Sequence, residues 1–212
     1  MKTLNQQLKT LLIEESKRHR LADELMQGAY FKGTIEKPKL CAVGCAIFTL
    51  NQKRGKEYDC GDHSVYPKEF GVPEQLAHLQ DKIFEYLPKE KAMFWPERFW
   101  LAMPVETDIS LVIPHFFVWL MEEMKQYAKE YPDVLSAISQ VQELYKREIK
   151  KENIENKEWH DAADATRYAA YAADAARYAA YAADAADAAR YAAEDTSYEK
   201  MADKLIEILE GI

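Results

Sequence analysis

Glycine and proline, the residues that most often interrupt helices, are scarce in this 212-residue chain and absent between Pro132 and Gly211. Within that interval, residues 161–193 read DAADATRYAAYAADAARYAAYAADAADAARYAA, and 19 of these 33 positions are alanine. Alanine has the highest helix propensity, so the segment predicts one long helix over about residues 157–210. Alanine side chains are too small for a single helix to bury its own surface, so this helix must pack on the rest of the chain or on another copy of it.

Cysteine and long apolar runs are also scarce. The chain has three cysteines, an odd number, and the opening MKTLNQQLKTLLIEESKRHR lacks the pattern of a secretory signal. Reduced thiols in a cytosol are therefore expected. The most apolar stretch, residues 109–121, is too short to span a bilayer and contains Pro114 and His115, so no membrane partner is expected.

Positive charge is scarce in the last part of the chain. The formal net charge is −8, and residues 151–212 hold 7 Lys/Arg and 14 Asp/Glu. Such an acidic segment disfavours a nucleic acid polymer as partner. Between residues 17 and 56, by contrast, lysine and arginine outnumber the acidic residues. This local basic region indicates a small anionic molecule as ligand.

Apolar spacing and the positions of glycine and proline predict an all-α protein. Residues 40–50 are apolar on all sides and could form a strand or a helix, of which we favour the helix. Residues 51–72 are polar and predict a loop. The remaining helices are expected over residues 3–27, 73–86, 89–102, 110–130 and 133–151. We expect a helical head domain, residues 1–150, and an Ala-rich helical tail, residues 151–212, that packs on the head or on another subunit.

Motifs of the common enzyme classes are missing: there is no Gly-rich phosphate loop, no H-E-x-x-H and no G-x-S-x-G. Two thiol patterns remain. Cys41, Cys45, Cys60 and His63 are residue types that bind structural zinc. Alternatively, Cys45 or Cys41 could act as a nucleophile with His63 as base and Asp62 or Glu69 as the residue that orients it. The simplest interpretation is that Cys41 and Cys45 are small buried apolar side chains.

Polar residues at helical spacing mark a third candidate site at the end of the first helix. His19, Asp23 and Gln27 follow one another at intervals of four, so one helical stripe would carry all three, facing either solvent or a ligand. In the ligand interpretation, His19 and Gln27 form hydrogen bonds, and Arg20 and Lys32 neutralise the anion. Tyr30 or Trp95 stacks on it. The full expected set is His19, Arg20, Asp23, Gln27, Tyr30, Lys32, Cys41, Cys45, His63, Tyr66 and Trp95.

Three segments give the chain a resemblance to a family of bacterial and bacteriophage proteins. They are CAVGC at residues 41–45, HSVYPKEFGVP at residues 63–73, and the tail rich in Ala, Tyr, Asp and Arg. The chain departs from that pattern at Leu40, where the family has Gly, at Phe48, where it has His, and in an apparent insertion over residues 51–61. The resemblance implies no particular activity, and it leaves Cys41, Cys45, His63, Tyr66 and Glu69 on matched positions.

Taken together, these patterns predict a cytoplasmic homo-oligomer that binds a small anionic or nucleotide-like molecule, with no cofactor. The resemblance implies that a phage protein of this kind could sequester a signalling nucleotide of its host. Two alternatives stay open: a thiol-dependent hydrolase that uses Cys45 and His63, and a purely structural oligomerisation module built on the alanine faces.

Overall fold

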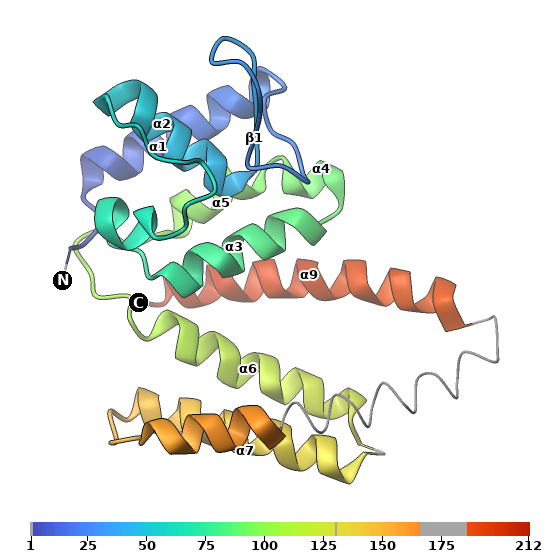
Figure 1. Ribbon diagram of the computed structural model, residues 1–212. Coiled ribbons are helices and arrows are strands. Elements are labelled where there is room, and N and C mark those ends of the chain that lie inside the picture. The colour runs from blue at the N-terminus through green and yellow to red at the C-terminus, as the bar shows by residue number, and fades with distance from the viewer. Residues whose placement is uncertain (1, 130, 166–185) are drawn as a thin grey trace. The chain divides into compact units, whose positions relative to one another are not determined.

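The protein is predominantly helical, as expected from the sequence (Figure 1). This computed structural model describes residues 2–129, 131–165 and 186–212. Beside the helices, the described residues contain one small sheet of two strands. None of the described helices is both long and apolar enough to cross a membrane.

The chain divides into two compact units. The first comprises residues 1–110 and 195–212, and the second comprises residues 111–194. This grouping differs from the expected head, 1–150, and tail, 151–212. The end of the tail belongs to the same unit as the first 110 residues, whereas residues 111–150 belong to the second unit.

The first unit begins with helix α1, Gln6–Leu21, whose N-terminus is capped by Asn5: its side chain accepts a hydrogen bond from the Leu8 amide. Helix α2, Ala42–Arg54, follows, and all of its first nine residues are buried. The helix favoured for the apolar segment 40–50 is thus confirmed from Ala42 onward, whereas Leu40 belongs to a strand. Cys41 caps α2 by accepting a hydrogen bond from the Gly44 amide at 3.3 Å.

Between these helices lies a short hairpin that the sequence did not indicate. Strand β1, Phe31–Gly33, pairs antiparallel with β2, Pro38–Leu40, and Phe31 lies opposite Leu40. Leu25 forms an isolated parallel bridge to Leu40. The pairing therefore brings the segment after α1 alongside the start of α2.

The rest of the first unit packs around aromatic residues. Its elements are the π-helix η1, Tyr66–Phe70, and helices α3, Glu74–Tyr86, α4, Lys89–Ala92, and α5, Trp95–Ala102. The helix expected over residues 89–102 is divided in two, and Pro96 lies in the first turn of α5, where the missing amide hydrogen costs nothing. Fully buried rings of this core are Tyr66, Phe70, Phe84, Trp95, Phe99 and Trp100.

The last residues of the chain complete the first unit. Helix α9, Ala186–Glu210, ends there with Ala202, Leu205 and Leu209 buried. The Tyr198 ring stacks on Tyr86 with a centroid distance of 4.9 Å. Two ion pairs add to this contact: Lys91 with Glu199 at 2.5 Å, and Arg98 with Asp203 at 2.9 Å. The end of the Ala-rich tail thus packs on α3, α4 and α5.

The second unit contains α6, Val112–Tyr127, α7, Pro132–Ile149, and a helical segment over residues 156–165. Phe117 of α6 stacks on Tyr145 of α7, with ring centroids 5.1 Å apart, and Trp159 packs against the same tyrosine. Most of the alanine repeat, residues 166–185, lies outside the described residues, so its expected role in self-association stays a prediction.

Candidate functional site

The expected polar stripe at the end of the first helix does not exist, and this is a correction to the sequence interpretation. Helix α1 ends at Leu21, and Asp23 adopts a left-handed backbone conformation with φ of 54°. Asp tolerates this conformation better than most residues. The chain then turns so that Leu25 can pair with Leu40, and His19, Asp23 and Gln27 therefore lie in three different settings.

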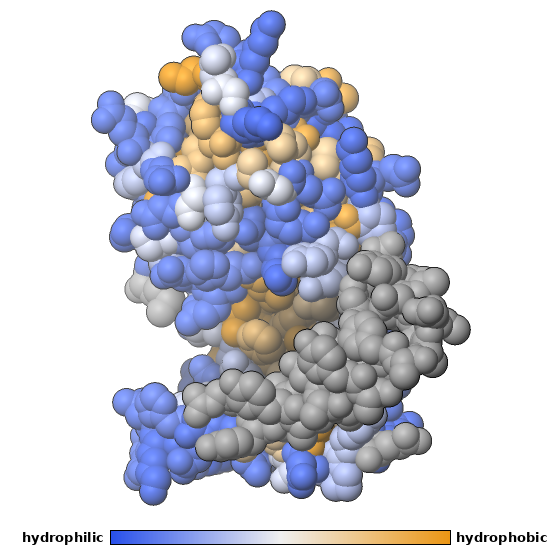
Figure 2. Space-filling model, turned by 45° about the vertical axis from the view of Figure 1, so that its right-hand side comes forward, coloured by the Kyte–Doolittle hydropathy of each residue, from blue (hydrophilic) through white to orange (hydrophobic). Residues whose placement is uncertain are grey.

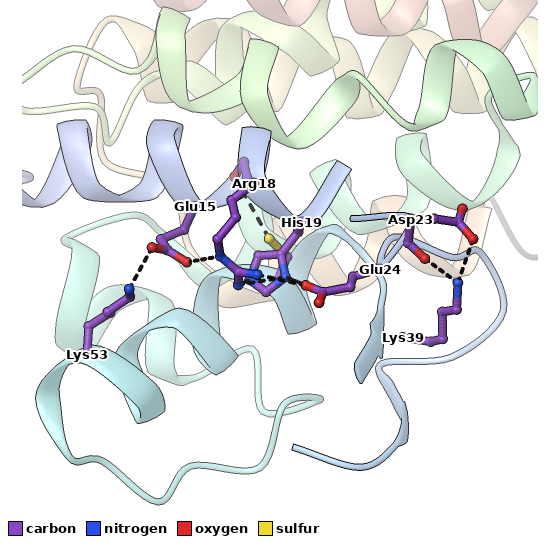
Figure 3. Close-up of polar contacts among 9 residues, drawn as sticks. Glu15, Arg18, His19, Asp23, Glu24, Lys39 and Lys53 are labelled. Atoms are coloured by element: carbon purple, nitrogen blue, oxygen red, sulfur yellow. Dashed lines mark hydrogen bonds and ion pairs between the residues drawn. The ribbon is translucent and has the colours of Figure 1, made fainter. Parts of the chain in front are cut away.

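His19 is buried and held in a network of charged side chains (Figure 3). Its Nδ1 lies 2.6 Å from Glu24 Oε2 and its Nε2 lies 3.0 Å from Arg18 Nη2. Since the carboxylate accepts and the guanidinium donates, His19 fits as the neutral tautomer with its proton on Nδ1. Burial lowers the pKa of His19, and the adjacent Arg18 lowers it further. Because both of its nitrogens contact protein side chains, His19 has a structural role.

Other residues of the expected binding set also have structural partners. Lys39 pairs with Asp23 at 3.0 Å, as Figure 3 shows. Arg20 forms an ion pair with Glu97 at 2.8 Å and lies over the ring of Phe94.

Gln27 and the buried aromatic residues of the set are likewise bound within the unit. The Gln27 side-chain amide lies within hydrogen-bond distance of the carbonyls of Phe84, Glu85 and Leu87, at the end of α3. Trp95 donates from Nε1 to the Gln80 carbonyl at 3.0 Å, and the Gln80 amide donates to the Tyr66 hydroxyl. These contacts hold helices together, and they leave little capacity for a ligand.

The thiol of Cys45 is poorly suited to act as a nucleophile. It is buried, its Sγ lies 3.9 Å from Ser16 Oγ, and burial raises its pKa to about 12. A nucleophilic cysteine needs a lowered pKa and access to substrate. Glu69, the expected orienting residue, accepts a hydrogen bond from the Tyr58 hydroxyl at 2.6 Å.

A different group of side chains converges at the start of α2. The Cys41 Sγ and one carboxylate oxygen each from Asp81 and Glu85 all lie within 4.8 Å of one another. Asp81 and Glu85 are one turn apart on α3, so both side chains leave the same face of that helix. Burial raises the pKa of the Cys41 thiol, and the Asp81 carboxylate raises it further. Burial likewise raises the pKa of Glu85.

His63 lies beside this group. Its Nδ1 is 3.0 Å from the Gly61 carbonyl, which can only accept, so Nδ1 carries the proton. Its Nε2 is buried without a hydrogen-bond partner, 3.4 Å from Asp81 Oδ2. The His63 ring stacks on His78, and the Tyr30 ring meets its edge. The adjacent Asp81 carboxylate raises the pKa of His63. We call Cys41, His63, Asp81 and Glu85 the polar centre.

Two glycines let Tyr30 approach the polar centre. A Cβ atom at Gly44 would lie 2.0 Å from the Tyr30 carbonyl oxygen, and one at Gly61 would lie 2.9 Å from its ring. Gly44 thus permits a close approach of the Tyr30 backbone. Of the eleven expected binding residues, the structure brings Tyr30, Cys41 and His63 together here.

Of the four zinc ligands expected from the sequence, the structure keeps one in a group close enough to share an ion. Among the described residues, that group is Cys41 with Asp81 and Glu85, and it does not include Cys45, Cys60 or His63. Cys60 packs against the apolar cluster of Leu25, Leu40, Cys45 and Phe48. Its partial burial raises its pKa to about 11.

A pocket of about 520 Å³ opens between the hairpin and α2. Its apolar side includes Phe31, Ile35 and Phe48. The Phe31 and Phe48 rings stack with their centroids 6.0 Å apart. Asn51, at the edge, exchanges two hydrogen bonds with the backbone of Tyr58 and so holds the loop in place. The remaining lining residues are polar or small: Gln52, Lys56, Glu57, Tyr58, Asp59 and Cys60.

Apolar side chains are exposed near this pocket. Ile35 is 62% exposed and Phe31 is 40% exposed, and both line the opening. Figure 2 shows that polar side chains cover most of this face of the first unit, with an apolar area in its upper part. Exposed large apolar residues on a mostly polar surface commonly mark an interaction site.

No protein-family model, no curated protein and no solved structure matches this chain. The bacterial and phage resemblance therefore stays a prediction, and the geometry alone must support the function.

Sequence reasoning missed Asp81 and Glu85, although a signal was present. Helix α3 buries Leu76, Ala77, Ile83 and Phe84 on one side. Asp81 falls on that buried side, where a carboxylate needs a partner. A charged residue on the apolar face of an amphipathic helix is the feature that could have identified it.

Proposed function

We propose that the protein binds a small planar molecule in the pocket between the hairpin and α2. The observation that carries this proposal is the pocket itself, whose volume of about 520 Å³ falls within the range of small-molecule sites. Its apolar side offers the Phe31 ring and Ile35 to a flat ligand, and its amide and hydroxyl groups lie at the edge. Such a mixture is typical of sites that bind one ligand in one orientation.

The charges around the pocket favour a neutral ligand over the anion expected from the sequence. Lys56 is its one lining cation, and it pairs with Glu69 at 3.4 Å. Glu57 and Asp59 contribute negative charge to the same edge. Elsewhere in the basic region, Arg18, Arg20, Lys39 and Lys53 also pair with carboxylates. A nucleotide would place its base well, but its phosphate would meet the acidic edge.

Two fluorescent probes that share one ring system test both parts of the proposal. N-phenyl-1-naphthylamine is neutral, and 8-anilinonaphthalene-1-sulfonate carries the same rings with an added sulfonate. We expect both to gain fluorescence with the protein, and the neutral probe to bind more tightly. Tighter binding of the sulfonate would contradict the charge preference, and no binding of either would contradict the pocket as a ligand site.

A matched pair of variants tests whether the probes bind in the pocket. Ile35→Ser removes an exposed apolar side chain from the pocket, and Leu21→Ser removes one from α1, outside the pocket. Loss of an apolar contact of this size costs about 1 kcal/mol, so I35S should weaken probe binding about fivefold to tenfold. L21S should leave it unchanged. Equal effects of both changes would show that the probes bind elsewhere.

A further inference from the structure

The polar centre contains two carboxylates close together, and His63 is the member of the group that can carry a positive charge. The carboxylates of Asp81 and Glu85 lie within 4.8 Å of each other, and the Asp81 side chain is only 12% exposed. Oδ1 of Asp81 is buried without a hydrogen-bond partner. Two carboxylates so close together repel each other, and burial strengthens the repulsion.

His63 adds an independent observation that points to the same place. Because its Nδ1–H donates to the Gly61 carbonyl, its Nε2 presents a lone pair 3.4 Å from a carboxylate oxygen. Two acceptors that face each other repel, and either a proton on Nε2 or a metal cation between the two atoms relieves that repulsion. A histidine whose other nitrogen donates to a backbone carbonyl is the usual arrangement of a metal ligand.

The atoms present match zinc. Thiolate, imidazole and carboxylate are its protein ligands, with bonds of about 2.0–2.3 Å, which place neighbouring ligand atoms of a tetrahedron about 3.3–3.8 Å apart. The His63–Asp81 separation of 3.4 Å already has this value. The Cys41, Asp81 and Glu85 atoms, within 4.8 Å of one another, would need to close by up to about 1.5 Å. His63 lies outside that group, so its ring would also have to move toward Cys41 and Glu85, and side-chain rotations can supply these shifts.

We propose that Cys41, His63, Asp81 and Glu85 hold one structural zinc ion. Cys41 loses its proton to solvent when the ion binds, since the thiolate is the ligand. With four protein ligands the coordination shell is closed, as in structural sites. The Gly28 amide donates to Glu85 at 2.6 Å and so orients that ligand. The ion ties the start of α2 and the loop that contains His63 to α3.

Cobalt(II) is the probe for this site, because cobalt bound to a thiolate absorbs in the near ultraviolet and replaces zinc in such sites. The full chain, stripped with a chelator, should take up one equivalent of cobalt with a thiolate-to-cobalt band, and zinc should then displace it. C41S should abolish the band. E85Q, on the partly exposed side of the centre, should weaken cobalt binding about 100-fold or more.

Two control variants complete the design. Cys60→Ser removes a thiol outside the polar centre, and His78→Gln removes the imidazole stacked on His63, so both should keep the band. Circular dichroism verifies that each variant is folded, and E85Q provides the test if C41S does not fold. A folded wild-type protein without a stoichiometric band would overturn the proposal. A band that persists in C41S or E85Q, or that C60S removes, would overturn it equally.

Discussion

At the scale of single residues, His19 shows how a functional-looking side chain can be structural. Its position near Asp23 and a group of cations suggested a ligand-binding histidine. In the structure it is fully buried, donates to Glu24 and accepts from Arg18, and its ring meets the edge of Phe48. A neutral buried histidine makes stability depend on pH, because the unfolded chain can take up a proton that the folded chain resists.

We predict that His19 destabilises the fold as the pH falls. Its folded pKa is lowered by burial from an ordinary value of about 6.5. Its stabilising contribution is therefore present above that value and lost below it. Relative to His19→Gln, the wild type should lose free energy of unfolding between about pH 7.5 and pH 5.5, as measured by urea denaturation.

The comparison with H19Q is needed because other groups titrate in the same range. His63 has a raised pKa, and its contribution to stability has the opposite sign. The charged groups that face His19 are Glu15, Arg18 and Glu24, and these are common to both proteins. A difference between the two proteins that stays constant, or grows in favour of the wild type on acidification, would contradict the assignment of a neutral His19.

The residue scale also marks the limit of sequence reasoning about the site. Cys41 and His63 were identified, since few other residues of the chain offer a thiol or an imidazole. Asp81 and Glu85 were not, since acidic residues on a helix usually face solvent. Their burial depends on the loop that carries His63, and its course cannot be derived from local sequence.

At the scale of elements, most helices followed from the positions of proline and from apolar spacing. Pro73 marks the start of α3, as expected. Pro132, which was expected to end the preceding helix, is instead the first residue of α7. The hairpin was missed because each strand has only three residues, one with Gly33 and the other with Pro38, which are typical of turns. The first helix was extended too far, because Leu25 continues its leucine spacing but pairs with Leu40 instead.

Gln27 provides a prediction at this scale, since its amide binds the last carbonyls of α3. Those groups have no partner within the helix. Gln27→Ala should lower the free energy of unfolding by about 1–2 kcal/mol, measured by urea denaturation. The control is Gln6→Ala, on the exposed start of α1, where the Gln6 amide donates to the Thr10 hydroxyl at 3.3 Å, and the change should stay within about 0.5 kcal/mol. Equal losses would mean that Gln27 does not cap α3.

At the scale of the whole molecule, the fold class was predictable and the grouping of residues was not. Composition and the long alanine-rich segment predicted an all-α protein, which is confirmed. The first unit, however, combines residues 1–110 with residues 195–212. Contacts such as that between Tyr86 and Tyr198 join residues more than a hundred positions apart, and no local pattern specifies such partners.

One loop of the first unit contributes to both proposed sites. The loop after α2 lines the pocket through residues 56–60 and then carries His63 into the polar centre. An ion at the polar centre would fix the far end of that loop. The pocket, in turn, depends on the contacts of Asn51 with Tyr58, which do not involve the ion. The neutral probe should therefore still bind the metal-free protein, and the two proposals can fail separately.

Native mass spectrometry tests the central claim, the convergence of four ligands on one ion, most directly. The full chain is stripped of metal, given one equivalent of zinc and compared with C41S, Asp81→Asn and C60S. We predict one zinc ion on each wild-type and C60S chain, and the bare polypeptide mass for C41S and D81N. Zinc retained equally by all four proteins, or by none of them while folded, would contradict the account.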